Sequence, residues 1–359
     1  MMTNTETYSD LAIPPGEYLL EATIERGLSQ AELARRMGRP IQAISEIVKG
    51  IKAITPDTAL QLEQVLDVPA HIWTGLETGY QLALARDEAQ KKIEEEAGDV
   101  ARFPYADMAK LGWVVSTRKA QEKVRELRRF FGVASLDNLS RVHSYAPAFR
   151  KSDRDGLSHE ALAAWLRAGV LKATDIDTRP FDKAALKELL PAIRNMTCEQ
   201  PDDFQAQLQQ SLADVGIALV LLPHLPKTYT HGATFWMQPD KAVLMMSLRG
   251  CWADIFWFSL FHELGHILLH GKRCTFLENG RHDPETQQQE AEADQFASDT
   301  LIPKDAYKLF IRDGDFSAVG IRDFAGSIRI APGIVMGRLQ HDAYLPHNNH
   351  HYQEKYCWA

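Results

Sequence analysis

The sequence predicts a multi-domain protein with an all-α N-terminal domain, a helical middle region and an α+β C-terminal domain. Short helical segments with capping residues fill the N-terminal part from Pro15 onward. From Gly216 the apolar pattern changes to short runs typical of strands, and helical patterns then resume. A length of 359 residues suits two or three domains that each bury a core. We place these domains at residues 1–80, 81–215 and 216–345, followed by a tail at 346–359.

Composition and charge exclude several classes of protein. With 45% apolar and 25% charged residues, the chain is typical of globular proteins rather than disordered ones. Its net charge of -8 argues against a protein that coats nucleic acid along its whole length, so we expect any such contact at a local basic patch. No apolar run approaches the length of a membrane span. The four cysteines are widely spaced and indicate reduced thiols, so we expect a cytoplasmic protein without membrane contact.

Amphipathic helices and a small sheet account for most of the remaining chain. The charged segment Arg86–Asp99 predicts a solvated connecting helix, and four amphipathic patterns within Ser116–Val215 predict helices without evident chemistry. Apolar runs at Gly216–Leu222 and Lys241–Leu248 predict strands of a mostly antiparallel sheet. Further helical patterns lie at Trp252–His270, Glu290–Leu301 and Ile321–Leu339.

Two short helices joined by a tight turn are predicted near the start of the chain. Ser29 and Glu32 fit the S-x-x-E capping box, in which the hydroxyl and the carboxylate each accept a backbone N–H. A helix therefore begins at about Gln30. Gly38 can adopt the left-handed conformation that ends this helix near Met37, and a proline two residues later suits the first turn of the next helix.

This pattern resembles the helix-turn-helix of the Xre/HigA class of repressors and antitoxins, and the resemblance continues through Gly50–Leu60 to Trp73. It implies that Pro40–Lys49 enters the major groove of double-stranded operator DNA and that a homodimer reads two half-sites. The segment Arg35–Lys52 holds five cations and one acid. A helical docking module with solvated cations is the alternative. The candidate DNA contacts are Gln42 and Ser45 toward bases, Gln30, Arg39, Lys49 and Lys52 toward phosphates, and Ala43.

His262, Glu263 and His266 form an H-E-x-x-H sequence. Histidines four residues apart project from one face of a helix and can converge on one metal ion, while the glutamate reaches the attacking water instead. The surrounding segment is strongly apolar, and burial of two unpartnered histidines there would be costly. The sequence therefore predicts a zinc site, with a hydrogen-bonded pair of core histidines as the alternative.

Tetrahedral catalytic zinc needs a third protein ligand and an open position. In the next helical segment Glu290 and Asp294 share one face, where alanines permit close approach to the H-E-x-x-H helix. Glu290 is therefore the expected third ligand, and Asp294 is expected to accept a hydrogen bond from a ligating histidine. Helical spacing directs Glu292 elsewhere. In the alternative, Glu290 is an ordinary exposed acid and the ligand is His270 or His282.

Four segments of the C-terminal part share one pattern: Phe256–Gly271, Glu290–Ala297, Leu301–Pro303 and Gly333–Gln340. They resemble the ImmA/IrrE family of bacterial and phage metallopeptidases. The resemblance implies a zincin-like metallopeptidase fold, a Zn²⁺ cofactor and an endopeptidase that cleaves a repressor in a stress or mobile-element response. One alternative is a transcriptional regulator or antitoxin whose metallopeptidase-like domain senses a ligand or metal without proteolysis. Another is a zinc hydrolase that acts on a non-peptide substrate.

The resemblance also implies roles for single residues. His262, His266 and Glu290 would hold Zn²⁺, and Glu263 would take a proton from the attacking water and pass it to the leaving amine. The strand Lys241–Leu248 is a candidate to bind substrate backbone as an added strand. The candidates for stabilising the oxyanion are Tyr229, His231 and His270.

Overall fold

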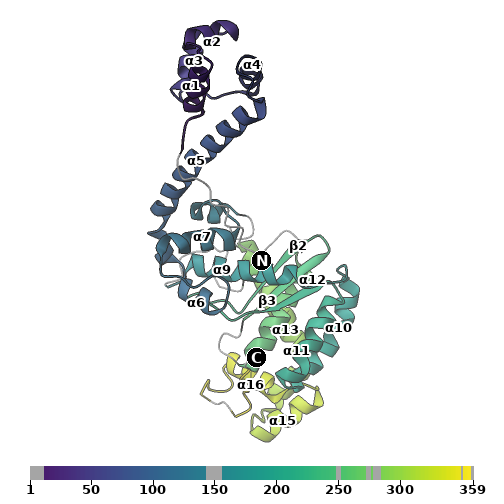
Figure 1. Ribbon diagram of the computed structural model, residues 1–359. Coiled ribbons are helices and arrows are strands. Elements are labelled where there is room, and N and C mark those ends of the chain that lie inside the picture. The colour runs from purple at the N-terminus through teal and green to yellow at the C-terminus, as the bar shows by residue number, and fades with distance from the viewer. Residues whose placement is uncertain are drawn as a thin grey trace. The chain divides into compact units, whose positions relative to one another are not determined.

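The computed structural model consists of two compact units, Met1–Gly98 and Asp99–Ala359, which are described separately (Figure 1). Both units are largely helical, and the second also contains a small sheet. The structure describes residues 12–142, 156–247, 252–271, 276–277, 284–348 and 351–356.

The N-terminal unit is all helical. Its core is formed by side chains such as Leu33, Ile44 and Trp73, which are at most 2% exposed. Gly16 permits close approach of the first and third helices, because a Cβ there would collide with the carbonyl of Ile47. The helices are α1 (Pro15–Glu25), α2 (Gln30–Arg36), α3 (Ile41–Val48), α4 (Pro56–Leu66) and α5 (Ala70–Glu96).

The boundary between the units lies after Gly98, beyond the expected end of the first domain at residue 80. The reason is the length of α5, which continues without interruption to Glu96. The charged segment 86–99, expected as a separate connecting helix, therefore supplies the second half of α5 and the residues that follow it.

The C-terminal unit combines helices with one sheet. Its elements are η1 (Asp99–Arg102), α6 (Tyr105–Lys110), α7 (Ala120–Phe131), η2 (Leu136–Arg141), α9 (His159–Thr174), α10 (Lys183–Asn195), η3 (Met196–Cys198), α11 (Pro201–Ala213), β1 (Ile217–Leu221), β2 (Gly232–Gln238), β3 (Lys241–Met246), α12 (Ala253–Leu269), β4 (Phe276–Leu277), α13 (Pro284–Leu301), α14 (Lys304–Asp313), α15 (Ala318–Ser327) and α16 (Pro332–His341).

The sheet is small and mixed, with strand order β1-β3-β2-β4. β1 pairs with β3 in parallel, Ile217 opposite Ala242, while β2 pairs antiparallel with both β3 and β4. The expectation that the Lys241–Leu248 strand accepts substrate as an added strand is wrong. The main chain of β3 is already paired on both sides, so it offers no open edge.

The middle helices belong to the same core as the C-terminal domain. Leu186 of α10 and Phe204 of α11 are fully buried together with Trp257 of α12, and the rings of Phe204 and Trp257 lie 4.8 Å apart. An amphipathic helix must bury its apolar stripe, and here the sheet and α12 provide the partner surface. Within the predicted connecting region 81–215, α10 and α11 therefore pack into the core of the C-terminal unit. These two helices help to hold the helix that carries the H-E-x-x-H sequence.

The described part of the predicted tail packs against this unit. Tyr356 is 1% exposed and accepts a hydrogen bond from the indole N–H of Trp257 at 2.9 Å. Burial raises the pKa of Tyr356 to about 12. Lys355 also forms an antiparallel bridge with Trp252, at the start of α12. Tyr356 and the partly buried Tyr352 thus belong to the core of this unit, whereas His351, Glu354 and Lys355 are exposed.

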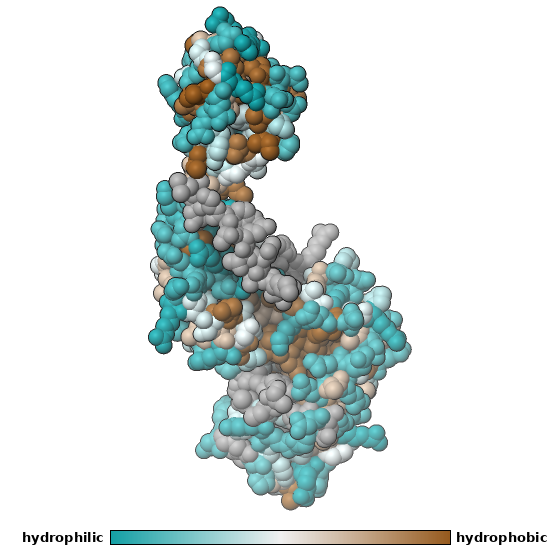
Figure 2. Space-filling view, viewed as in Figure 1, coloured by the Kyte–Doolittle hydropathy of each residue, from teal (hydrophilic) through white to brown (hydrophobic). Residues whose placement is uncertain are grey.

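The visible surface of each unit is mostly hydrophilic, with apolar residues in smaller groups (Figure 2). Within the ranges that the structure describes, no helix is both long and apolar enough to cross a membrane.

Candidate metal centre and DNA-reading helix

Helices α12 and α13 pack closely where the candidate metal ligands lie. Gly265 permits this approach, since a Cβ at that position would lie 3.2 Å from the Cα of Ala293 and 3.1 Å from the ring of Phe296. The small residues on both helices therefore bring the histidines of α12 next to the first turns of α13, as the alanine pattern predicts.

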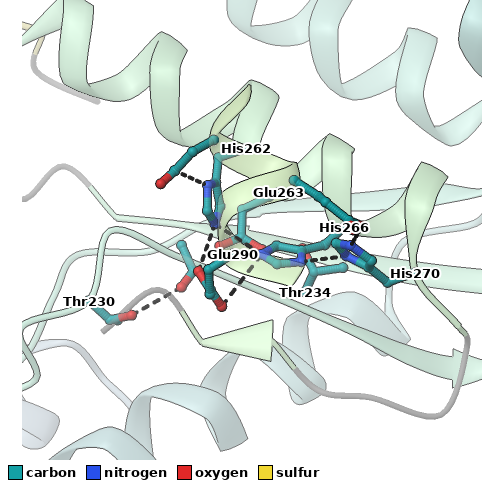
Figure 3. A network of polar contacts seen from close by, with 10 residues as sticks. Thr230, Thr234, His262, Glu263, His266, His270 and Glu290 are labelled. Carbon is teal, nitrogen blue, oxygen red and sulfur yellow. Dashed lines mark hydrogen bonds and ion pairs between the residues drawn. The ribbon is translucent and has the colours of Figure 1, made fainter. Parts of the chain in front are cut away.

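The structure brings His262, His266 and Glu290 together, with one ligand atom of each within 4.8 Å of the others. The two Nε2 atoms lie 2.9 Å apart, His262 Nε2 lies 3.2 Å from Glu290 Oε2, and His266 Nε2 lies 3.7 Å from Glu290 Oε1. Figure 3 shows the three side chains pointing toward one another from the two helices. Both histidines are 2% exposed, so the cluster is part of the interior.

The spacing and chemistry of these atoms fit zinc. Bonds of 2.0–2.1 Å arranged tetrahedrally place ligand atoms about 3.3 Å apart, close to the 2.9 to 3.7 Å seen here. Two imidazoles and one carboxylate are a zinc donor set, whereas hard cations prefer oxygen ligands alone. His282, the other alternative ligand, lies outside the described residues.

Each histidine is oriented by a hydrogen bond at its other ring nitrogen. His262 Nδ1 lies 2.8 Å from Asp294 Oδ1, so a proton on Nδ1 leaves the Nε2 lone pair directed at the cluster. His266 Nδ1 lies 2.9 Å from His270 Nδ1, and His270 Nε2 lies 3.2 Å from Glu292 Oε2. One consistent set of tautomers has His270 donating to Glu292 and accepting from His266.

The structure places His270 and Glu292 next to each other, which the sequence pattern does not predict. Helical spacing directs Glu292 away from the cluster, yet it reaches His270, whose side chain is only 4% exposed. The reason is that α12 ends at Leu269 and His270 has extended backbone, with φ -109° and ψ 165°. A projection that continues the helix to residue 270 therefore gives the wrong position for the His270 ring. The sequence signal that connects His270 with the two ligands is the H-x3-H-x3-H spacing of His262, His266 and His270.

The pKa values in the cluster follow from burial and from these contacts. Burial lowers the pKa of His266, and the hydrogen bond with Glu290 opposes this only partly. Burial raises the pKa of Glu290, but hydrogen bonds with His262 and His266 outweigh it and hold the pKa far below its usual value. The arrangement thus favours neutral imidazole and ionised carboxylate, the forms that bind a metal.

Glu263 lies against the sheet beside the histidines (Figure 3). Its carboxylate is fully buried, and Oε2 accepts a hydrogen bond from the hydroxyl of Thr234 in β2. Gly232, the first residue of β2, makes room for it, because a Cβ there would lie 2.6 Å from Glu263 Oε1. The position of this carboxylate therefore depends on two strand residues that the motif does not include.

The three oxyanion candidates occupy different places. His270 contacts the ligand His266, as described above. His231 precedes β2 and lines a cavity next to α12. The Tyr229 hydroxyl lies beside Gly156, where a Cβ would be 3.2 Å away.

Helices α2 and α3 have the expected caps and turn. The Ser29 hydroxyl accepts a hydrogen bond from the backbone N–H of Glu32 at 3.2 Å, and Gly38 has a φ of +66°. The Glu32 carboxylate departs from the capping box, because it pairs with Arg36 at 3.0 Å and with Arg35 at 2.8 Å. Two of the five cations in the predicted patch thus share one carboxylate, which offsets one of their two positive charges.

The candidate DNA contacts fall into exposed and buried groups. Lys49 and Lys52 are exposed, and Ser45 and Gln30 are partly exposed. Gln42 is exposed and donates a hydrogen bond to Glu46 at 3.0 Å, within α3. Ala43 is 8% exposed and lies in the buried set of α3, so its assignment as a DNA contact is wrong.

Arg39 makes its contacts within the N-terminal unit. Its guanidinium pairs with Asp57 and donates to Gln61 at 2.5 Å, both on α4, and its side chain is 20% exposed. These contacts tie the start of α3 to α4. The exposed cations at the end of α3 are therefore Lys49 and Lys52.

Comparison with known proteins identifies both regions. A family model described as Helix-turn-helix matches residues 19–73, and one described as IrrE N-terminal-like domain matches residues 254–317. Virulence-associated protein I of Dichelobacter nodosus is 38% identical over 80 residues, which are 22% of this chain and 74% of that protein. The chain belongs to the helix-turn-helix family and carries an IrrE N-terminal-like domain.

Further relatives cover a similar share of the chain. The uncharacterized HTH-type transcriptional regulator YddM of Escherichia coli (strain K12) is 30% identical over 80 residues, 22% of this chain and 81% of that protein. Among solved structures, the antitoxin HigA of Pseudomonas aeruginosa with the higBA promoter is 34% identical, covering 24% of this chain and 95% of that chain with a TM-score of 0.23. A HigA-family antidote protein of Coxiella burnetii is 32% identical, covering 24% and 94% with a TM-score of 0.22.

The matched segments contain the candidate metal ligands and the candidate DNA contacts, whereas Tyr229 and His231 lie outside them. The IrrE-like match includes the H-E-x-x-H sequence, Glu290 and Asp294, and the helix-turn-helix match includes α2 and α3. A helix-turn-helix DNA-binding domain combined with an IrrE-like domain supports a regulatory protein.

Proposed function

We propose that this protein is a zinc-dependent endopeptidase with a DNA-binding regulatory domain, which cleaves a repressor or another partner protein in a stress or mobile-element response. The observation that carries the proposal is the cluster of His262, His266 and Glu290, with the carboxylate of Glu263 next to it. Two buried imidazoles held by further hydrogen bonds, facing one carboxylate, are a costly arrangement without a cation.

The residues around the cluster have distinct tasks in this proposal. Zn²⁺ held by His262, His266 and Glu290 would polarise the scissile carbonyl and make water a better nucleophile at neutral pH. Glu263 takes a proton from the attacking water and transfers it to the departing amine. Asp294 keeps His262 in the tautomer that presents Nε2. A proton transfer of this kind contributes about 100- to 10,000-fold to the rate.

The N-terminal unit supplies the regulatory part of the proposal. A homodimer binds a palindromic operator in the cytoplasm, with Gln42 and Ser45 toward the bases and Lys49 and Lys52 toward phosphates. Gln42 must then exchange its bond to Glu46 for one to a base edge, where a glutamine can pair with adenine through two hydrogen bonds.

Glu263→Gln in the full chain tests the proteolytic function. The zinc-loaded protein is incubated with tryptic peptides of a bacterial proteome and, separately, with an intact bacterial extract, and new termini are identified by mass spectrometry. We expect cleavage by the parent protein and none by the variant, because the amide cannot accept the proton. Zinc content is measured in both proteins, and Asp299→Asn on the exposed side of α13 serves as the matched control.

Two outcomes would contradict the proposal. Equal cleavage by parent and Glu263→Gln would show that the activity does not arise at this site. No cleavage by fully zinc-loaded parent protein would favour the alternative, a regulator whose metallopeptidase-like domain senses a ligand or metal without proteolysis.

A further inference from the structure

A cavity of about 320 Å³ lies among α12, α13 and α16. Its lining includes Ile255 and Phe258 of α12, Leu301 of α13 and Ile334 of α16, together with the adjacent Ile302. Most of the surface that these residues present is hydrocarbon. A ligand that enters the cavity therefore gains mainly by removing apolar surface from water.

The cavity adjoins the metal centre along both helices that carry the ligands. Phe258 lies one turn before His262, and the centroids of the two rings are 6.5 Å apart. Ser298, also in the lining, lies one turn after Asp294 on α13. Residues four apart share a helix face, so the cavity continues the same face beyond the ligands.

The charged groups at the cavity have partners within the protein. Arg338 donates to Asp342 at 2.7 Å, and His341 Nδ1 lies 3.0 Å from the same carboxyl group. Asp254 accepts a hydrogen bond from Gln353 at 3.2 Å. Arg338 and His341 thus face a carboxylate of the protein, and most of the remaining lining is apolar, so the cavity fits a neutral apolar group better than a charged one.

We infer that this cavity binds one large apolar side chain of the polypeptide substrate, such as Leu, Ile, Met or Phe, next to the scissile bond. The inference rests on the proposed function, because the metal centre defines where that bond lies. The cavity volume is at the lower end of ligand sites, which suits a single side chain better than a drug-sized molecule. Peptide bonds beside such a residue are then cleaved in preference to those beside Gly or Asp.

Two hydroxamic acids with the same metal-binding group test the inference without requiring turnover. Acetohydroxamate and 4-methylpentanohydroxamate differ only in the branched alkyl chain, and their binding to the zinc-loaded full chain is measured by calorimetry. We expect the branched compound to bind at least about 10-fold more tightly, since its extra carbons enter the cavity.

Ser298→Phe fills the cavity from α13, and Asp299→Phe adds the same ring at the neighbouring exposed position as a control. The ratio of the affinities for the branched compound and for acetohydroxamate is expected to fall to about 1 in Ser298→Phe and to stay unchanged in Asp299→Phe. Ser298→Leu, a smaller change, is expected to reduce it partly. Zinc content and circular dichroism establish that each variant is folded. A second readout is the set of cleavage sites, which shifts toward small residues in Ser298→Phe.

The possible results separate this inference from the proposed function. Equal binding of the two hydroxamates to zinc-loaded parent protein would overturn the cavity assignment and leave the metal centre intact. An alkyl preference that Ser298→Phe does not change would also overturn it. A preference that Ser298→Phe abolishes, in a protein that cleaves no peptide, would support binding of an apolar group here while contradicting the endopeptidase.

Discussion

The metal centre and the DNA-reading helix differ in how the fold holds their side chains. His262 and His266 are 2% exposed, and each ring has a hydrogen bond at one nitrogen and a cluster contact at the other. On α3, Gln42 and Lys49 are exposed, and the contact that Gln42 makes is with its own helix. Burial thus fixes the first set of groups, because a buried polar atom without a partner is costly, whereas exposed groups pay no such penalty.

If the protein functions as proposed, this difference implies that the metal centre is preorganised, while the DNA contacts form when DNA replaces internal partners. Substitutions should therefore have large, all-or-none effects at the metal centre and smaller, graded effects on α3. The following experiments test that contrast, beginning with the largest expected effect.

Replacing both His262 and His266 with Ala is expected to reduce bound zinc from about one ion per chain to below about 0.1, because a single carboxylate cannot hold zinc in place. Elemental analysis of purified protein measures this directly. Substituting the two exposed histidines His347 and His351 in the same protein is the control. Full zinc occupancy in the His262/His266 variant would refute the metal centre as assigned.

Asp294→Ala and His270→Ala each remove a group that orients a ligand, and we expect zinc affinity to fall by about 10- to 100-fold in each. Competition with a chelator of known affinity provides the measurement. Asp299→Ala, also exposed on α13, should leave the affinity unchanged. If the three variants bind zinc alike, the hydrogen bonds at Nδ1 do not position the ligands.

Gln42→Ala is expected to lower the ratio of affinities for the operator and for an operator with a substituted base pair, by about 5- to 100-fold. The loss concerns sequence discrimination, since a glutamine side chain contributes little to phosphate binding. Gel shifts at fixed salt give both affinities, with Gln64→Ala on α4 as the control. An unchanged ratio would place the base-reading residues elsewhere on the unit.

Lys49→Ala is expected to weaken binding to all sequences alike and to lower the slope of log affinity against log salt by about 0.9. Arg39→Ala is the informative comparison, because Arg39 is already paired with Asp57 and should change the slope much less. Titrations over a range of salt concentrations distinguish the two. Equal slope changes would mean that Arg39 leaves Asp57 for a phosphate in the complex.

Local sequence signals predict the elements around both sites well. The predicted helix from Gln30 to Met37 corresponds to α2, which ends at Arg36, since Ser29 and Gly38 fix its two ends through side-chain and backbone chemistry. The spacing of the H-E-x-x-H sequence and the alanines after Glu290 likewise place three ligand atoms together, because both depend only on helical periodicity and close packing.

Features that depend on contacts distant in sequence could not be predicted in this way. The parallel pairing of β1 with β3 and the central position of β3 arise from the path of the chain, which no local pattern specifies. The bond from Arg39 to Asp57 joins residues of different helices, so a count of cations overstates the exposed positive charge. The contacts of His270 with His266 and Glu292 could not be predicted either, because the helix ends at Leu269, the residue before it.

Gly232 has a consequence for how related chains are classified. The carboxylate of Glu263 fits only because this residue, thirty-one positions before it, has no side chain. In a homologue with a complete H-E-x-x-H sequence but a larger residue at the position of Gly232, that residue would displace the glutamate. Such a protein would be inactive as a peptidase although its motif is intact. To distinguish peptidases from sensors among such sequences, the residue at the start of β2 must therefore be compared as well as the motif on α12.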